Sequence, residues 1–172
     1  MVDRLDKLST CSLRADQEAL LGPQAVKVGI AAPLGPPVLK LRENPGVMSC
    51  AVVGDSIAEM VQHYLPQCEH NTKIGISSTA VISRTPSGKD VVIASAGSND
   101  PDNPNLRKNL EAIQARGAHI IWILPVAARP RTIVSDVATA NKEETVGFEP
   151  AGDHVHPRHP DVLARDIKKL MD

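Results

Sequence analysis

A serine, an asparagine and a histidine–aspartate pair are the residues of this sequence whose types and spacing could do chemistry. Ser56 lies in Gly-Asp-Ser-Ile at 54–57, directly after an apolar run. A serine that follows a buried strand and starts a helix is positioned as a nucleophile, and the N–H groups of the helix start could stabilise a developing oxyanion. The alternative interpretation is that Asp55 or Ser56 simply caps the helix.

Two later turns carry the other groups that acyl chemistry uses. Asn99 lies in Gly-Ser-Asn-Asp at 97–100, and its amide is a donor of the kind that completes an oxyanion hole; the alternative is a plain turn. Asp153 and His156 are three residues apart, a spacing that can place both side chains on one side of a turn. His156 could then act as a general base oriented by Asp153, and the alternative is a solvated polar loop.

A metal site is a rival interpretation of the same C-terminal stretch. Potential ligands are dense there: Asp153, His154, His156, His159 and Asp161. Their spacing matches no standard ligand motif such as His-Glu-x-x-His. We therefore expect no metal.

Alternating strand and helix patterns must position these groups. From residue 49 onward, short apolar runs that end in Gly, Pro or turn residues alternate with segments of helical spacing. Strands are expected at 50–53, 72–76, 91–94, 120–124 and 145–148, and helices at 57–65, 103–117, 132–140 and from Pro160. Strands that are apolar on both faces predict an α/β domain with a parallel sheet, in which chemistry lies at the carboxyl ends of the strands.

Residues 1–48 differ in composition from residues 49–172. Pro23, Pro33, Pro36, Pro37 and Pro45 lie there, out of 14 prolines in the chain. Because proline fixes φ and removes a backbone donor, this stretch is neither one long helix nor a central strand. We expect residues 1–48 to be an arm for docking or self-association, and residues 49–172 to be the catalytic domain. The alternative is that the arm is a partly ordered tail.

Composition excludes several functions and compartments. The formal net charge is −1, which disfavours a nucleic-acid partner, and aromatic residues make up 2% of the chain, which disfavours ligands held by stacking. No apolar run is long enough to span a membrane, and the N-terminus lacks the order of a signal peptide. The three cysteines, an odd number without metal-ligand spacing, suit a reducing compartment, with Cys50 a small buried hydrophobe. We therefore expect a cytoplasmic or virion-associated protein.

Four blocks in order resemble the SGNH, or GDSL-like, hydrolase family over residues 49–172. They are Gly54-Asp55-Ser56-Ile57, Gly75 within Asn71-Thr72-Lys73-Ile74-Gly75-Ile76-Ser77, Gly97-Ser98-Asn99-Asp100, and Asp153-His154-Val155-His156-Pro157. The resemblance implies a three-layer α/β/α flavodoxin-like fold with a mostly parallel five-stranded sheet. It also implies cleavage of esters or other acyl groups through an acyl-enzyme, with no cofactor.

The resemblance also implies a role for each residue. Ser56 would be the nucleophile, and the backbone N–H groups of Ser56 and Gly75 with the Asn99 side chain would form the oxyanion hole. His156 would be the base, held in the productive tautomer by Asp153. The sequence departs from the family in two places: Ile57 stands where leucine is usual, and Ser-Ser-Thr at 77–79 where a further glycine is common.

The short links between the blocks bear on the substrate. Little chain is available to roof the site, which predicts a shallow, open cleft. Such a cleft suits a small acyl group, such as acetyl, on a bulky carrier such as a carbohydrate or another polymer. Two alternatives remain open: transfer of the acyl group to an acceptor other than water, and a structural or assembly subunit whose site is weak or vestigial.

Overall fold

The computed structural model describes residues 46–117 and 119–172. The predicted arm at residues 1–48 therefore lies almost entirely outside the described residues, as does Cys11. The separation of arm and catalytic domain stays a prediction.

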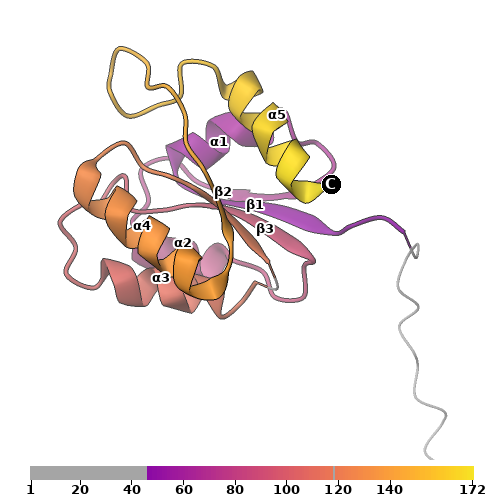
Figure 1. Cartoon of the computed structure of the whole chain (residues 1–172), viewed down its shortest axis with the longest axis horizontal. Coiled ribbons are helices and arrows are strands. Elements are labelled where there is room, and N and C mark those ends of the chain that lie inside the picture. The colour runs from indigo at the N-terminus through magenta and orange to yellow at the C-terminus, as the bar shows by residue number, and fades with distance from the viewer. Residues whose placement is uncertain (1–45, 118) are drawn as a thin grey trace, which may run out of the picture. The chain divides into compact units, whose positions relative to one another are not determined.

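Five parallel strands form the central sheet of the described chain (Figure 1). They are β1 (Cys50–Gly54), β2 (Glu69–Thr72), β3 (Val91–Ser95), β4 (Ile120–Ile123) and β5 (Glu144–Val146). Their order in the sheet is β2-β1-β3-β4-β5, and every neighbouring pair is parallel. This is the strand order of flavodoxin-like doubly wound folds, so the predicted fold class is confirmed.

Helices cover both faces of the sheet and make the two outer layers (Figure 1). On one face lie α1 (Ser56–Gln62) and α5 (Pro160–Met171), and on the other lie α2 (Ser78–Arg84), α3 (Leu106–Gln114) and α4 (Ala128–Asn141). Side chains alternate along β1, so Val52 packs with α1 and α5 while Val53 packs with α2, α3 and α4. Two separate apolar cores result, one on each side of the sheet.

Two elements differ from the sequence prediction. The second strand was expected at 72–76, but β2 ends at Thr72 and Ile74 lies in the following turn, 70% exposed. The apolar pattern did not predict the bounds of β2, because β2 is an edge strand. Its residues Glu-His-Asn-Thr are exposed or half-buried and none of them is apolar. Helix α2 occupies a stretch that was expected to be a short link.

The chain reverses its direction of travel across the sheet at β1. From β1 it passes through α1 to β2 on one side of β1, and from β2 it returns through α2 to β3 on the other side. The connections that leave the carboxyl ends of β1 and β3 therefore diverge to opposite faces, which opens a crevice between them. Ser56 lies two residues after the end of β1, and the turn with Asn99 follows β3, so both lie at this crevice.

The cysteine interpretation was wrong for two of the three cysteines. Cys50 and Cys68 form a disulfide, with Cα atoms 4.7 Å apart and a sequence separation of 18. Cys50 begins β1 and Cys68 directly precedes β2, its neighbour in the sheet, so the parallel pairing brings the two sulfurs together. The argument from cysteines for a reducing compartment therefore fails, and the cytoplasmic or virion-associated localisation stays a prediction.

Within the part of the chain that the structure describes, no helix has both the length and the apolar character needed to cross a membrane.

Candidate active site

The turn from β1 into α1 holds Ser56 in one position. Gly54 has φ +138, and a Cβ there would lie 2.2 Å from the carbonyl oxygen of Ser95 on β3. Only glycine allows this approach of the two strands. Asp55 then caps α1, because its Oδ1 accepts hydrogen bonds from the Ile57 N–H at 3.1 Å and the Ser95 hydroxyl at 2.8 Å. The turn that carries Ser56 is thereby fixed to the end of β3.

Asp55 is buried, with 1% of its surface exposed. Burial raises the pKa of this carboxyl above its usual range, although the hydrogen bonds from Ser95 and Ile57 act in the opposite direction. The capping interpretation therefore holds for Asp55. It leaves the Ser56 hydroxyl available for another partner.

The segment between β5 and α5 brings the histidine to the serine. It crosses from β5 to the face of the sheet that carries α1 and α5 (Figure 1). Its stem is closed by an antiparallel bridge between Pro150 and Pro157 and by a hydrogen bond of 2.7 Å from the Ala151 N–H to the His156 carbonyl. At the tip, His154 adopts φ +58, which turns the chain so that residues 153 and 156 face one another.

Ser56, His156 and Asp153 form a continuous hydrogen-bonded chain. His156 Nε2 lies 2.8 Å from Ser56 Oγ, across 100 residues of sequence. His156 Nδ1 lies 2.6 Å from Asp153 Oδ2. The serine side chain thus meets one ring nitrogen and the carboxylate meets the other, which is the arrangement of a nucleophile, a base and its orienting acid.

Local hydrogen bonds hold Asp153 in its charged form. Its Oδ1 accepts from the backbone N–H groups of His156 and Val155, each at 3.0 Å. These two donors and the His156 ring hold the pKa of Asp153 well below its usual range. Because an ionised carboxylate can only accept, His156 Nδ1 carries a proton and Nε2 presents its lone pair to the Ser56 hydroxyl.

Asn99 and Gly75 are not among the residues that line the cleft bordered by Ser56, His156 and Asp153. The Asn99 amide donates to the Ile76 carbonyl at 3.0 Å, which joins the turn after β3 to the turn after β2. Gly75 has φ +76 and lies between Ile74, which lines the cleft, and Ile76. A carboxamide has two N–H donors, so the second N–H of Asn99 is not used by this bond.

Asp100, next to Asn99, fixes the turn after β3. Its carboxylate accepts from the Ser78 N–H at 3.1 Å, from the Ser78 hydroxyl at 2.5 Å and from the Asn103 amide at 2.8 Å. Ser78 begins α2 and is fully buried. The resemblance gave no role to Asp100, and the structure places it as the anchor that positions Asn99.

An open cleft lies in front of Ser56. Its volume is about 410 Å³. The described residues that line it are Ser56, Glu59, Met60, Ile74, Ala151, Asp153, His156 and Pro157. Apolar side chains make most of the wall, and Glu59 adds a carboxylate. Sequence analysis did not single out Glu59 or Met60, although helical spacing places residues three and four positions after Ser56 on its side of α1.

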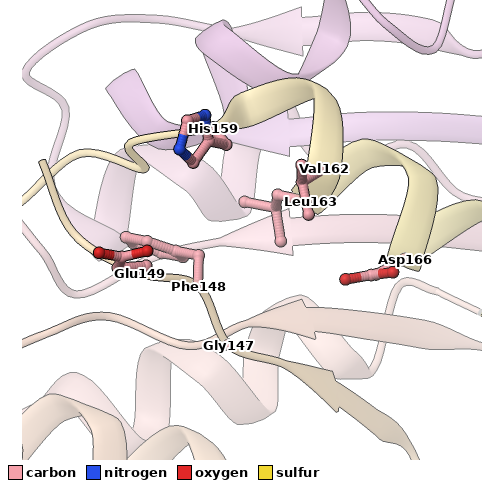
Figure 2. A pocket seen from close by; sticks show the side chains of 7 residues that line it. All are labelled: Gly147, Phe148, Glu149, His159, Val162, Leu163 and Asp166. Carbon is pink, nitrogen blue, oxygen red and sulfur yellow. The ribbon is translucent and has the colours of Figure 1, made fainter.

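A second, smaller cavity of about 200 Å³ lies against α5 (Figure 2). Its lining residues are Gly147, Phe148, Glu149, His159, Val162, Leu163 and Asp166. None of them borders the cleft at Ser56. Figure 2 shows His159 at the start of α5, with Phe148 and Leu163 among the lining residues.

The potential metal ligands of residues 153–161 are not gathered into one site. His156 and Asp153 are bonded to each other, and His159 lines the second cavity. Over residues 46–117 and 119–172, no group of three or more His, Cys, Asp or Glu side chains is placed to hold a metal ion.

Comparison with known proteins found little. No protein-family model matches the chain, and no curated protein is similar to it. Among solved structures, the C-terminal catalytic domain of Streptococcus pneumoniae peptidoglycan O-acetyltransferase A, solved with a methylsulfonyl adduct, is similar with a TM-score of 0.39 and 17% identity. The match covers 56% of this chain and 62% of that domain, so the chain spans less than two thirds of its length. Nothing about activity follows from so distant a likeness.

Proposed function

We propose that this chain is a serine hydrolase of SGNH type that removes short acyl groups from esters. One observation carries the proposal: Ser56 Oγ, His156 and Asp153 are joined by contacts of 2.8 and 2.6 Å at the crevice beside β1. The ordered blocks of sequence support it independently.

The proposed reaction has two acyl-transfer steps. His156 Nε2 takes the proton of Ser56 as Oγ attacks the ester carbonyl carbon, and the imidazolium then gives that proton to the departing alcohol oxygen. A water molecule attacks the carbonyl carbon of the resulting acyl-serine and loses a proton to Nε2. The bond between that carbon and Oγ then breaks, the imidazolium returns the proton to Oγ, and the carboxylic acid leaves. Asp153 stabilises the imidazolium in both steps and keeps its own charge.

Three donors are proposed to stabilise the oxyanion. The Ser56 N–H lies in the first turn of α1, where backbone donors have no acceptor within the helix. The Gly75 N–H and the second N–H of Asn99 are the other two. Each donor in such a site contributes roughly 10²- to 10³-fold to kcat in enzymes of this kind.

The cleft supports a small acyl group on a bulky carrier. Met60, Ile74 and Pro157 offer apolar contacts to an acyl chain. Ile74 is exposed, and the side chains of Asp153 and His156 are also partly exposed, so a large alcohol can remain outside the cleft. We propose acetyl and similar short esters, with a carbohydrate or another polymer as the carrier.

Replacing Ser56 with alanine tests the proposal. Wild-type protein is expected to hydrolyse p-nitrophenyl acetate and to be labelled at Ser56 by a fluorophosphonate probe. Ser56→Ala is expected to lose labelling and to lower kcat/KM by at least about 10³-fold. Ser83→Ala, on the exposed side of α2, is the matched control and should retain both.

Turnover that survives in Ser56→Ala would refute the assignment of the nucleophile. Folded wild-type protein that is neither labelled nor active would instead support the rival interpretation of a structural or assembly subunit. Release of the acyl group to an added alcohol faster than to water would identify an acyltransferase.

A further inference from the structure

Glu59 is the acidic side chain of the cleft that the proposed reaction does not use. It lies three residues after Ser56 in α1 and lines the same cleft. Residues with this spacing are neighbours on a helix, with Cβ atoms roughly 5–6 Å apart. The carboxylate of Glu59 is therefore close to any ester whose carbonyl carbon is within reach of Ser56.

Hydrogen bonds to β2 hold Glu59 at the wall of the cleft. The Thr72 hydroxyl donates to Glu59 Oε2, and Thr72 Oγ1 also lies 2.8 Å from the side-chain amide oxygen of Gln62. Thr72 is the last residue of β2, and Gln62 is buried at the end of α1. A hydrogen bond to one oxygen of the carboxylate restricts the side chain of Glu59 to this position at the wall of the cleft.

The negative charge of Glu59 has no opposite charge beside it in the cleft. No lysine or arginine is among the described residues that line the cleft. Over residues 46–117 and 119–172, no ion pair involves Glu59. The other carboxylate of the cleft, that of Asp153, is hydrogen-bonded to the His156 ring.

We propose that Glu59 selects the substrate by charge, favouring acyl esters of cationic alcohols over neutral ones and neutral ones over anionic ones. This inference rests on the proposed ester hydrolysis at Ser56. A cationic alcohol, such as a quaternary ammonium or amino alcohol, would place its positive charge against the Glu59 carboxylate while its ester carbonyl meets Ser56. Glu59 is thus a specificity-determining residue.

The expected size of the effect follows from Coulomb's law. A unit charge about 7 Å from the carboxylate, in an open, water-filled cleft whose effective dielectric constant lies between about 40 and about 80, changes kcat/KM on the order of 3- to 10-fold. Because the cleft is open, mobile ions screen the interaction, and the preference should fall as ionic strength rises.

A pair of esters of equal shape tests the inference. Acetylcholine and 3,3-dimethylbutyl acetate differ in charge and hardly in size. Because of the attraction to Glu59, wild-type protein is expected to show a kcat/KM on the order of 3- to 10-fold higher for acetylcholine at low salt. Glu59→Gln keeps an acceptor for Thr72 and should bring the ratio to about one, because the charge that distinguishes the two esters is removed.

Control variants and outcomes separate the two proposals. Glu111→Gln removes an exposed carboxylate from α3, on the far face of the sheet, and should leave the ratio unchanged. Fluorophosphonate labelling of Ser56 in Glu59→Gln reports that the site is still folded. Equal kcat/KM for the two esters in the wild type, or a preference that persists in Glu59→Gln, would overturn the selection by Glu59. Failure of the wild type to hydrolyse either ester would overturn the proposed function and this inference with it.

Discussion

At the scale of residues, the candidate site depends on short contacts that orient each of its groups. Asp153 accepts two backbone N–H groups on one oxygen and the His156 ring on the other. This sets the protonated nitrogen of the ring, and with it the nitrogen that faces Ser56. An isolated serine and histidine at the same distance would not have a defined tautomer.

Replacing Asp153 with asparagine is expected to remove this control. The asparagine oxygen can still accept from the Val155 and His156 N–H groups, but its amide would present a donor to Nδ1 and favour the wrong tautomer. We expect kcat to fall by about 10²- to 10⁴-fold, measured with p-nitrophenyl acetate. Asp136→Asn, on the exposed surface of α4, is the control and should keep wild-type kinetics. Retention of full activity in Asp153→Asn would contradict the role of the carboxylate.

The lowered pKa of Asp153 also predicts how stability depends on pH. A carboxylate whose folded pKa lies below its unfolded value of about 3.9 stabilises the fold above that value and loses this contribution as pH falls through the folded pKa. The difference in Tm between wild type and Asp153→Asn should therefore be constant from about pH 8 to about pH 5 and shrink below about pH 4. A difference that grows on acidification would contradict the direction of the shift.

Gly54 is the residue at which the chain tolerates no side chain. A Cβ there would lie 2.2 Å from the Ser95 carbonyl oxygen, which belongs to a strand that cannot move without breaking the sheet. We expect Gly54→Ala to lower the free energy of unfolding by about 3 kcal/mol or more, or to prevent folding, as measured by denaturant titration. Gly152→Ala, where a Cβ meets nothing within 4 Å, should change stability by less than about 0.5 kcal/mol.

At the scale of elements, the edge strand β2 is held to β1 by other contacts in addition to the backbone hydrogen bonds between the two strands. β2 has four residues, all exposed or half-buried, so apolar burial contributes little to its docking. The Cys50–Cys68 disulfide joins the start of β1 to the residue before β2, and the Lys73 N–H donates to the Gly54 carbonyl at the other end. These two ties position the turn that carries Ile74 and Gly75 at the cleft.

Removing the disulfide is expected to lower stability by about 3 kcal/mol, because the crosslink closes a loop of 18 residues in the unfolded chain. The measurement is denaturant unfolding of wild type and of the double variant Cys50→Ala/Cys68→Ala. Reductant should lower the stability of the wild type and leave the double variant unchanged. An identical response of both proteins to reductant would contradict a disulfide that stabilises the fold.

At the scale of the whole described domain, the strand order decides where chemistry can occur. The crossovers from β1 and β3 leave toward opposite faces, and this divergence creates the crevice into which Ser56 and the turn with Asn99 project. The long segment after β5 then returns to that crevice with His156. Because few other residues roof it, the cleft stays open, which is the reason to expect that the carrier can be large.

The class of fold and the candidate residues could both be predicted from the amino-acid sequence. Central strands of a parallel sheet are buried on both faces, so their sequences are continuous apolar runs. This pattern predicted β1, β3 and β4. The same pattern failed at β2, because an edge strand buries too little to impose an apolar sequence. Ser56, Asp153 and His156 could be proposed as site residues because the local sequence shows both their residue types and their positions after predicted strands.

Which of these groups come into contact depends on the three-dimensional packing of the chain. The approach of His156 to Ser56 spans 100 residues, and it depends on a closed stem at 150–157 and on a strand order that no local pattern encodes. The same holds for the disulfide and for the placement of Glu59 at the cleft beside Ser56. Contacts between distant segments follow from the packing of the whole sheet and its helices, whereas the spacing of residues along the chain reports local conformation alone.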